Sequence, residues 1–339
     1  MTTKTKLSSI LPKIKISGLG TYLPRKKVSN KDLEKIMDTT ENFIVEKTGV
    51  LERRFVEKNE TNAMLMEHAI RGASQKSKVP LEKIDALIVN TLSPDFHDPS
   101  QACLVQGIIN ELIGIPAFDI RAQCAGFLYG AYLAKSLIVS GTANHVLVVC
   151  GEVNSKRMVG DKGDRNIAVL AGDGAGAAVV SKADDMVGFL DFSVGADGSY
   201  FDLLKTEAPG VHGEKFLSQN DFDKNKWLFK MKGPELFEHA TETIIFEVKK
   251  MLKKHAINHS HLHSIICHQP NVRMLEYIAD KLEIPRDKFV INAHKYGNIA
   301  SASLPIAWAE SVGDHSPGDL SLIIGFGAGS TWGTAMYRH

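Results

Sequence analysis

Short apolar runs alternate with longer segments that carry apolar residues every three or four positions along the first half of the chain. The first kind predicts buried strands, and the second predicts helices with one apolar face. We expect strands at residues 14–18, 84–90, 117–120 and 146–150, and helices at 31–36, 63–76, 100–112 and 125–139. Strands that alternate with helices usually run in one direction, so this pattern predicts a largely parallel sheet covered by helices.

The second half of the chain repeats this order of elements. Helices are expected at residues 234–254, 272–282 and 300–312, and strands at 264–267, 289–291, 320–324 and 331–337, with a loop at 325–329. The repeated order predicts an internal duplication of one α/β unit, with halves at residues 1–185 and 186–339. Residues 208–226, which are rich in Gly, Asn, Asp and Lys, predict a surface loop.

Composition narrows the classes of function. The chain has 40 basic and 39 acidic residues, so no nucleic acid is expected as a partner. Its four cysteines contain no C-x-x-C pair, which argues against a zinc site and fits a reducing cytoplasm. The N-terminus lacks the apolar core of a signal peptide, and no apolar run is long enough for a membrane helix. We therefore expect a cytoplasmic protein.

Cys124 is the first candidate for chemistry. It follows a short predicted strand and stands at the start of a predicted helix. Free N–H groups at a helix N-terminus favour a thiolate over a thiol. The alternative is a buried, inert cysteine, which is the commoner use of a single cysteine.

Three polar residues of the second half form the other candidates. His268 and Asn271 follow an apolar strand, where open α/β sheets place ligand sites, and Asn298 follows Gly297 in a tight turn. The alternative is that these residues only satisfy turn backbone. The histidines of segment 259–263 lack a carboxylate or cysteine partner nearby, so a solvated loop is favoured over a metal site.

Taken together, these segments resemble β-ketoacyl-acyl-carrier-protein synthase III, a family of the thiolase superfamily. The resemblance runs from residue 14 to 338 and is carried by motifs that occur in the family's order. These are GLGTYLP at 18–24, TGVLERR at 48–54, DIRAQCAGF at 119–127, GDGAGA at 172–177, HQPN at 268–271, GN at 297–298 and FGAG at 326–329. The resemblance implies a thiolase-like duplicated α/β fold, with two central mixed sheets layered with helices as α-β-α-β-α.

The resemblance also implies roles for individual residues. Cys124 would take an acyl group from acyl-CoA, and backbone N–H groups of Cys124 and Ala328 would form the oxyanion hole. His268 and Asn298 would bind the carbonyl of a malonyl thioester during decarboxylation, without a metal or redox cofactor. Further implied residues are Phe43, Lys47, Arg165, Gly233, Asn271 and Arg273 for coenzyme A and substrate, and Asp98 and Phe326 for the acyl pocket. A homodimer is implied as well.

Departures from the family pattern bear on the substrates. Phe43 replaces a tryptophan, while Glu238 and Asp280 replace lysines that receive acyl carrier protein, which favours malonyl-CoA as donor. Asp98 replaces a phenylalanine that caps the pocket of the partner subunit. The segment around Asp98 and several neighbouring segments resemble those of the anthraniloyl-condensing ketosynthase of alkylquinolone biosynthesis. Ala328, however, stands where that branch has serine. The acyl primer therefore stays open between acetyl, medium-chain and aromatic groups.

Two other classes of function are weighed against a condensing enzyme. A non-decarboxylating acyltransferase of the same fold would not need both His268 and Asn298. A non-catalytic partner subunit would not need Cys124. The presence of all three residues favours decarboxylative condensation.

Overall fold

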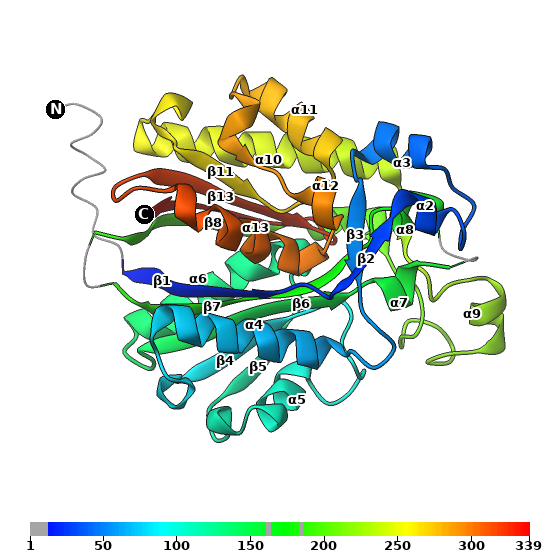
Figure 1. Ribbon diagram of the computed structural model, residues 1–339, viewed down its shortest axis with the longest axis horizontal. Coiled ribbons are helices and arrows are strands. Elements are labelled where there is room, and N and C mark those ends of the chain that lie inside the picture. The colour runs from blue at the N-terminus through cyan, green and yellow to red at the C-terminus, as the bar shows by residue number, and fades with distance from the viewer. Residues whose placement is uncertain (1–12, 161–163, 184–185) are drawn as a thin grey trace.

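The protein, seen in a computed structural model that describes residues 13–160, 164–183 and 186–339, is built in layers. Figure 1 shows α10 and α11 over one sheet, α6 and α13 between the two sheets, and α4 and α5 beneath the other sheet. These helices are α4 (Asn62–Ser77), α5 (Gln101–Ile108), α6 (Gly126–Val139), α10 (Gly233–His255), α11 (Val272–Leu282) and α13 (Ser303–Ser311). The order of layers is therefore α-β-α-β-α, as the resemblance implies.

The two large sheets share one arrangement of strands. The first runs in the order β1 (Ile14–Tyr22), β7 (Asp173–Lys182), β6 (His145–Val153), β4 (Ala86–Asn90) and β5 (Ala117–Ile120). The second runs in the order β8 (Gly188–Ala196), β14 (Thr331–Arg338), β13 (Leu320–Gly327), β11 (Ser264–Cys267) and β12 (Phe289–Val290). In each sheet the first three strands pair antiparallel and the last three pair parallel.

The prediction of a largely parallel sheet was therefore wrong for one side of each sheet. Parallel neighbours need a crossover long enough to return to the start of the sheet. Between β6 and β7 the described chain forms only the short helices α7 (Ser155–Met158) and α8 (Arg165–Ala168), so β7 starts at the edge where β6 ends and runs back. Mixed sheets are confirmed. The predicted boundary after residue 185 adjoins residues 184–185, which lie outside the described ranges, and stays a prediction.

Apolar side chains alternate between the layers along each central strand. Ile88 of β4 and Ile323 of β13 point into the core between the sheets, which also contains apolar residues of α6 and α13. Their neighbours Leu87 and Val89 pack against α4 and α5, while Ile324 packs against α10 and α11. Each sheet is buried on both faces, which is why these strands read as continuous apolar runs.

Most predicted elements are confirmed, and the differences lie at their ends. The helix expected at 31–36 is only α2 (Asn30–Leu33), which Ser29 caps, and the helix expected at 100–112 ends at Ile108 before a 3-10 turn. The loop expected at 325–329 is shorter, because β13 continues to Gly327.

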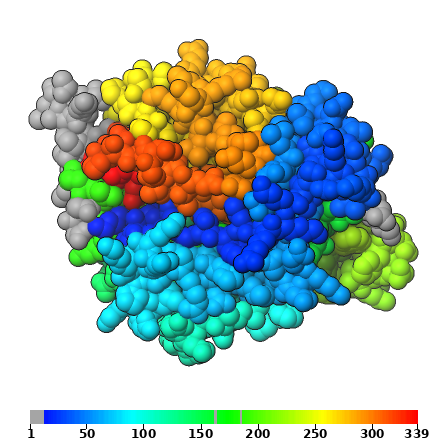
Figure 2. Space-filling model, viewed as in Figure 1, coloured from blue at the N-terminus to red at the C-terminus, as the bar shows by residue number. Residues whose placement is uncertain are grey.

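Smaller elements complete the described chain. They are β2 (Lys26–Ser29), α3 (Glu41–Thr48), β3 (Glu52–Phe55), β9 (Leu204–Lys205), α9 (Gln219–Asp223), β10 (Lys230–Met231) and α12 (Ala293–Tyr296). Segment 208–226 is mostly exposed and contains α9, which projects at one end of the molecule (Figures 1 and 2). In the described ranges no helix is both long and apolar enough to cross a membrane. Residues 1–12, on which the signal-peptide prediction rests, lie outside those ranges.

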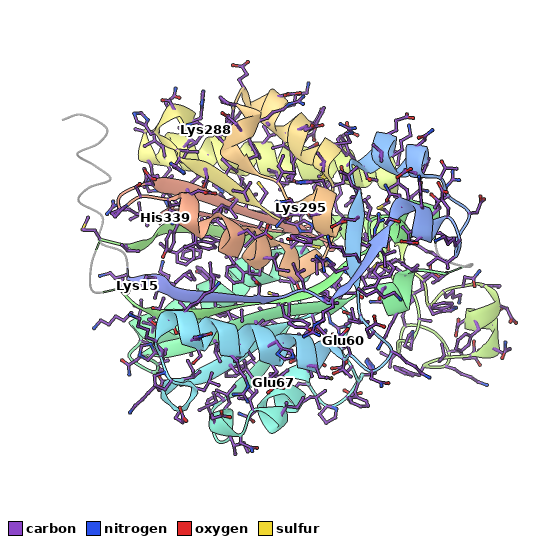
Figure 3. All side chains as sticks on the ribbon, in the orientation of Figure 1. Lys15, Glu60, Glu67, Lys288, Lys295 and His339 are labelled. Carbon is purple, nitrogen blue, oxygen red and sulfur yellow. The ribbon has the colours of Figure 1, made fainter. Side chains whose placement is uncertain are left out.

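The surface carries charged side chains over both halves of the molecule. Figure 3 shows Glu60 and Glu67 on the half that contains α4, and Lys288 and Lys295 on the half that contains α10 and α11. This mixture agrees with the net charge of +1.

A buried carboxylate ties the two halves together beside the predicted site. Glu152 of β6 is 0% exposed and accepts hydrogen bonds from the Ser93 hydroxyl at 2.8 Å and from the Leu92 N–H at 3.1 Å. It also accepts from the hydroxyl of Ser301, which lies in the second half. Burial raises the pKa of Glu152 to about 7, although these hydrogen bonds act in the opposite direction.

This raised pKa predicts a pH-dependent loss of stability. The unfolded chain releases the Glu152 proton near its ordinary pKa of 4.5, while the folded protein holds it until about pH 7. The contribution of Glu152 is therefore fully present below pH 4.5 and is lost as the pH rises through about 7. We expect Glu152→Gln to lessen the fall in unfolding free energy between pH 5 and pH 8 by about 2–3 kcal/mol in urea titrations.

The exposed Glu242→Gln variant serves as the matched control and should keep the wild-type dependence on pH. Glu152→Gln also places an amide against hydrogen-bond donors, which lowers stability by about 1–3 kcal/mol at every pH. Equal slopes against pH for wild type and Glu152→Gln would contradict the interpretation.

Candidate active site

One cavity of about 690 Å³ contains the three residues predicted to be catalytic. Phe43 and the exposed Lys47 of α3 line one part of it, and Cys124, His268 and Asn298 line another. The three residues come from segments that are far apart in the chain. The fold therefore brings together the nucleophile candidate of the first half and the polar candidates of the second half.

Asn90 fixes the backbone that leads into Cys124. Its Oδ1 accepts from the N–H of Ala122 at 3.0 Å, and its Nδ2 donates to the carbonyl of Gln123 at 3.1 Å. A Cβ on Gly126 would lie 2.1 Å from the Asn90 amide carbon, so only glycine allows this approach. Cys124 is thus held in a 3-10 turn (Gln123–Ala125) that leads directly into α6.

The protonation state of Cys124 differs from the expectation. Burial raises the pKa of the Cys124 thiol, and the nearby carboxylate of Glu152 raises it further. A helix N-terminus alone would have lowered it, but the cost of desolvating a thiolate is larger here. The surroundings of Cys124 therefore favour the thiol over the thiolate.

His268 lines the same cavity as Cys124. Burial lowers the pKa of His268 to about 3, which keeps the imidazole neutral. Its Nδ1 lies 2.6 Å from the Ser303 hydroxyl, and that hydroxyl donates to the carbonyl of Ala300 at 2.8 Å. In this arrangement Nδ1 carries the proton, which leaves the lone pair on Nε2.

The side chain of Asn298 is fixed through its oxygen. Oδ1 accepts from the N–H of Ala300 at 2.8 Å, so Nδ2 is left to donate within the cavity. The preceding Gly297 has φ +66°, and a Cβ there would lie 2.5 Å from the carbonyl oxygen of Leu170. The turn therefore requires glycine and sets the position of Asn298.

The turn after β13 packs against Cys124. A Cβ on Gly327 would lie 2.6 Å from the backbone nitrogen of Cys124, and Ala328 lines the cavity beside it. The turn is held by the Thr331 hydroxyl, which donates to the carbonyl of Ala122 at 2.9 Å, and by Ser330, whose hydroxyl lies 2.7 Å from His239 Nε2. Gly327, which precedes Ala328, thus adjoins the backbone of Cys124, and the shared oxyanion hole stays a prediction.

Left-handed backbone occurs beside each of these three segments. Gln123 has φ +51°, Ala300 has φ +42° and Ser330 has φ +49°. A residue with a Cβ disfavours this conformation by about 1–2 kcal/mol. Strained residues of this kind cluster at functional sites when the surrounding packing holds them in place.

The residues predicted to bind coenzyme A fall into two groups. The Arg165 guanidinium lies 4.2 Å from the centroid of the Phe43 ring, a cation–π contact at the open end of the cavity. Lys47, Gly233 and Asn271 line the cavity, and Asn271 also caps α11 by accepting from the N–H of Met274.

Two other predicted residues lie elsewhere. Arg273 pairs with Glu276 and donates to the carbonyls of Val45 and Glu46 at the end of α3. Asp98 is exposed and does not line this chain's cavity, whereas Phe326 does. Asp98 therefore forms no part of the acyl pocket within one chain, and its predicted contact with a partner subunit stays a prediction.

The histidine segment has a structural use. The Nδ1 of His261 accepts from the N–H of Asn258, which closes the 3-10 turn His259–His261. Over the described ranges, no group of three or more His, Cys, Asp or Glu side chains could hold a metal ion.

Several supporting residues were not found from the sequence. Ser303 contacts the ring of His268, and Asn90 holds the backbone before Cys124. Contacts of this kind join residues that are far apart in the chain, so the sequence alone does not predict them. Asn90 offered a partial signal, because a polar residue at the end of a buried strand often faces a site. Glu152 offered a similar signal within an apolar strand.

Comparisons with known proteins agree with this geometry. Residues 118–198 match the family model of 3-oxoacyl-[acyl-carrier-protein] synthase III, and residues 252–339 match the model of its C-terminal part. The chain is 37% identical to β-ketoacyl-[acyl-carrier-protein] synthase III of Aliarcobacter butzleri, over 95% of this chain and 96% of the relative. It is 38% identical to the Aquifex aeolicus protein of the same name, over 96% of this chain and 99% of that protein.

A solved structure shares the fold. The crystal structure of 3-oxoacyl-[acyl-carrier-protein] synthase III from Aquifex aeolicus superimposes with a TM-score of 0.86 and 38% identity, and the match covers 96% of this chain and all of that one. The fold, the cavity that Cys124, His268 and Asn298 line, and the full-length similarity lead to one conclusion: the chain belongs to the 3-oxoacyl-[acyl-carrier-protein] synthase III family and is an acyltransferase of the condensing type.

Proposed function

We propose that Cys124 accepts an acyl group from acyl-CoA and that His268 and Asn298 then promote its condensation with a malonyl thioester. The observation that carries this proposal is the convergence of the three side chains on one cavity, with Phe43 and Lys47 at its open end. The malonyl carboxylate leaves as carbon dioxide, which drives formation of the carbon–carbon bond. We propose that the reaction therefore needs no metal or redox cofactor.

The first half-reaction begins with removal of the Cys124 proton. The neutral His268 accepts this proton at Nε2 while Sγ attacks the carbonyl carbon of the acyl thioester. The oxyanion that forms accepts hydrogen bonds from the N–H groups of Cys124 and Ala328. Collapse of this intermediate releases coenzyme A, which takes the proton from His268 and leaves as a thiol.

The second half-reaction uses His268 and Asn298 as donors. The Asn298 Nδ2–H and an Nε2–H of His268 bind the carbonyl oxygen of the malonyl thioester and stabilise the enolate left by loss of carbon dioxide. This step requires the tautomer with its proton on Nε2, which forms when the Nδ1 proton exchanges with solvent and the Ser303 hydroxyl turns from the Ala300 carbonyl to donate to Nδ1. The enolate carbon then attacks the acyl carbon, the bond to Cys124 breaks, and the released thiolate takes up a proton.

Coenzyme A is proposed to enter beside Phe43 and Arg165. Their cation–π contact can open to receive the adenine ring between an aromatic face and a guanidinium plane. Lys47 offers a positive charge to the phosphates, while Gly233 and Asn271 border the path of the pantetheine arm.

A first experiment tests the nucleophile and the two donors. We expect acyl-CoA to add one acyl group to the wild-type protein and none to Cys124→Ala, measured by intact-protein mass spectrometry. We expect His268→Ala or Asn298→Ala to slow carbon dioxide release from malonyl-CoA by about 10²- to 10³-fold, the usual effect of losing one donor to an oxyanion. The exposed His212→Ala variant is the matched control. The absence of an adduct with every thioester tested would contradict the proposal.

We propose malonyl-CoA as the preferred donor. An acidic carrier protein is attracted by positive charge, but on α11 Arg273 pairs with Glu276, and Asp280 pairs with Arg286. Glu238 adds an exposed negative charge on α10. This surface has little net positive charge to steer an acidic partner.

Reversing the two acidic charges tests this preference. We expect the double variant Glu238→Lys, Asp280→Lys to raise kcat/KM for malonyl-acyl carrier protein at least tenfold at low salt, while kcat/KM for malonyl-CoA changes less than twofold. Glu82→Lys, beside the other sheet, is the control. A wild-type enzyme that already prefers the carrier protein, at all salt concentrations, would contradict the proposal.

A second copy of the chain is proposed to pair along β5. This strand is the edge of its sheet, and Phe118 on it is 46% exposed. Two further apolar side chains, Ile113 and Phe96, are 65% and 62% exposed in the segments on either side of α5. An exposed edge strand flanked by apolar residues is a ready template for pairing with another strand.

Sedimentation tests the dimer. We expect twice the chain mass of 37.1 kDa for the wild type and a single chain mass for Phe118→Asp. Phe246→Asp, on the exposed face of α10, should leave the mass unchanged. A monomeric wild-type protein at micromolar concentration would rule the dimer out.

A further inference from the structure

The cavity continues beyond the catalytic residues into the space between α10, α11 and the second sheet. Ala240 and Ile244 of α10 line this extension, together with Leu275 and Ile278 of α11. Ile324 of β13 lines it from the sheet. We call this extension, defined by these five side chains and Cys267, the helix-pair arm.

The helix-pair arm penetrates an apolar core. Ile278 is 0%, Leu275 1% and Ile324 2% exposed, and all three belong to the cluster that joins α10 and α11 to the sheet. The one polarisable group is Cys267, whose thiol stays neutral because burial raises its pKa. An apolar space of this kind has no partners for water and takes apolar ligands instead.

The charges of the two thioester substrates decide which of their groups can enter the helix-pair arm. Coenzyme A carries phosphates, and the malonyl group carries a carboxylate, so both would lose hydration without gaining a partner. The acyl chain of the primer is the uncharged, apolar part. Gly325, between Ile324 and Phe326, packs against the catalytic turn, because a Cβ there would lie 3.5 Å from the Cys124 carbonyl oxygen. The lining of the arm thus adjoins Cys124, within reach of an acyl group on it.

We propose that the helix-pair arm is the binding site for the primer and that this primer is a medium-chain aliphatic acyl group. This inference rests on the proposed acylation of Cys124 and adds the class of acyl group to it.

The geometry of α10 sets the length of the chain. Ala240 and Ile244 line the arm, and Phe237 lines the adjoining part of the cavity, seven residue steps before Ile244 in the helix. At 1.5 Å per step these positions extend about 10 Å along the helix axis. An extended chain advances about 1.2 Å per single bond, as the extended polypeptide does, so the arm and the adjoining part of the cavity take about eight carbons.

Chain-length selectivity is the direct test. We expect Cys124 to be acylated at least tenfold faster by octanoyl-CoA than by acetyl-CoA, because each buried methylene favours binding by up to about fourfold. Ile244→Trp and Ile278→Trp fill the far end of the arm. Each should slow acylation by octanoyl-CoA at least tenfold and change acylation by acetyl-CoA less than twofold.

Matched variants separate filling of the arm from a general effect on α10. Phe246→Trp adds a similar ring on the exposed face of the same helix and should leave both rates unchanged. Ile244→Ala lengthens the arm and should shift the preferred substrate from octanoyl-CoA toward dodecanoyl-CoA. If a tryptophan variant does not fold, the shift of Ile244→Ala toward longer acyl chains still tests whether the arm binds the acyl chain.

Two outcomes would overturn the inference. The first is an octanoyl rate that neither the tryptophan nor the alanine variants change, while Cys124 is still acylated. The second is faster loading of acetyl-CoA or anthraniloyl-CoA than of octanoyl-CoA. A protein that gains no acyl group from any thioester instead contradicts the proposed function itself.

Discussion

Packing between the two sheets holds the site together. α6 begins immediately after Cys124, and α13 begins shortly after Asn298. Both helices are buried in the middle layer, where the rings of Phe127 and Trp308 meet edge to face with centroids 6.1 Å apart. Since neither helix can move without opening this core, the nucleophile and the amide donor keep a fixed separation.

The three candidate catalytic groups are a thiol, an imidazole and an amide, and desolvation favours the neutral form of the first two. Burial keeps Cys124 as a thiol and His268 as an uncharged imidazole. Neutral groups of this kind are suited to a thioester, whose charge develops only during the reaction. Glu152 lies behind them, and its hydrogen bonds to both halves make it a structural tie close to the chemistry. The burial that accompanies packing of the two halves therefore also shifts the pKa values of Cys124 and His268.

Local patterns in the sequence were sufficient for elements whose signals are local. The strands at 117–120 and 264–267 and the helix at 272–282 have the predicted bounds, since turn residues and caps delimit them. The direction of β7 was not predicted correctly, because it depends on the route of the chain after β6. The motifs brought Cys124, His268 and Asn298 to one cavity, while three other predicted residues, Asp98, Arg165 and Arg273, do not line it. The pKa of Cys124 depends on burial, which results from contacts across the whole fold.

The helix-pair arm was not visible in the sequence for a related reason. Ala240, Ile244 and Ile278 follow ordinary helical periodicity, and such positions usually fill a core. Whether they enclose a space depends on the volumes of side chains from three elements at once. Periodicity in the sequence predicts which side chains face the core. It does not predict whether those side chains leave a cavity, because this depends on how they pack together.

The shared strand order has a consequence for how the site is built. Cys124 follows β5 and precedes α6, and Asn298 follows β12 and precedes α13. In the matching order of the two sheets β5 corresponds to β12, so the same strand-to-helix junction occurs twice. One copy presents a thiol and the other an amide. The same kind of strand-to-helix junction thus supplies a different functional group from each sheet to one cavity.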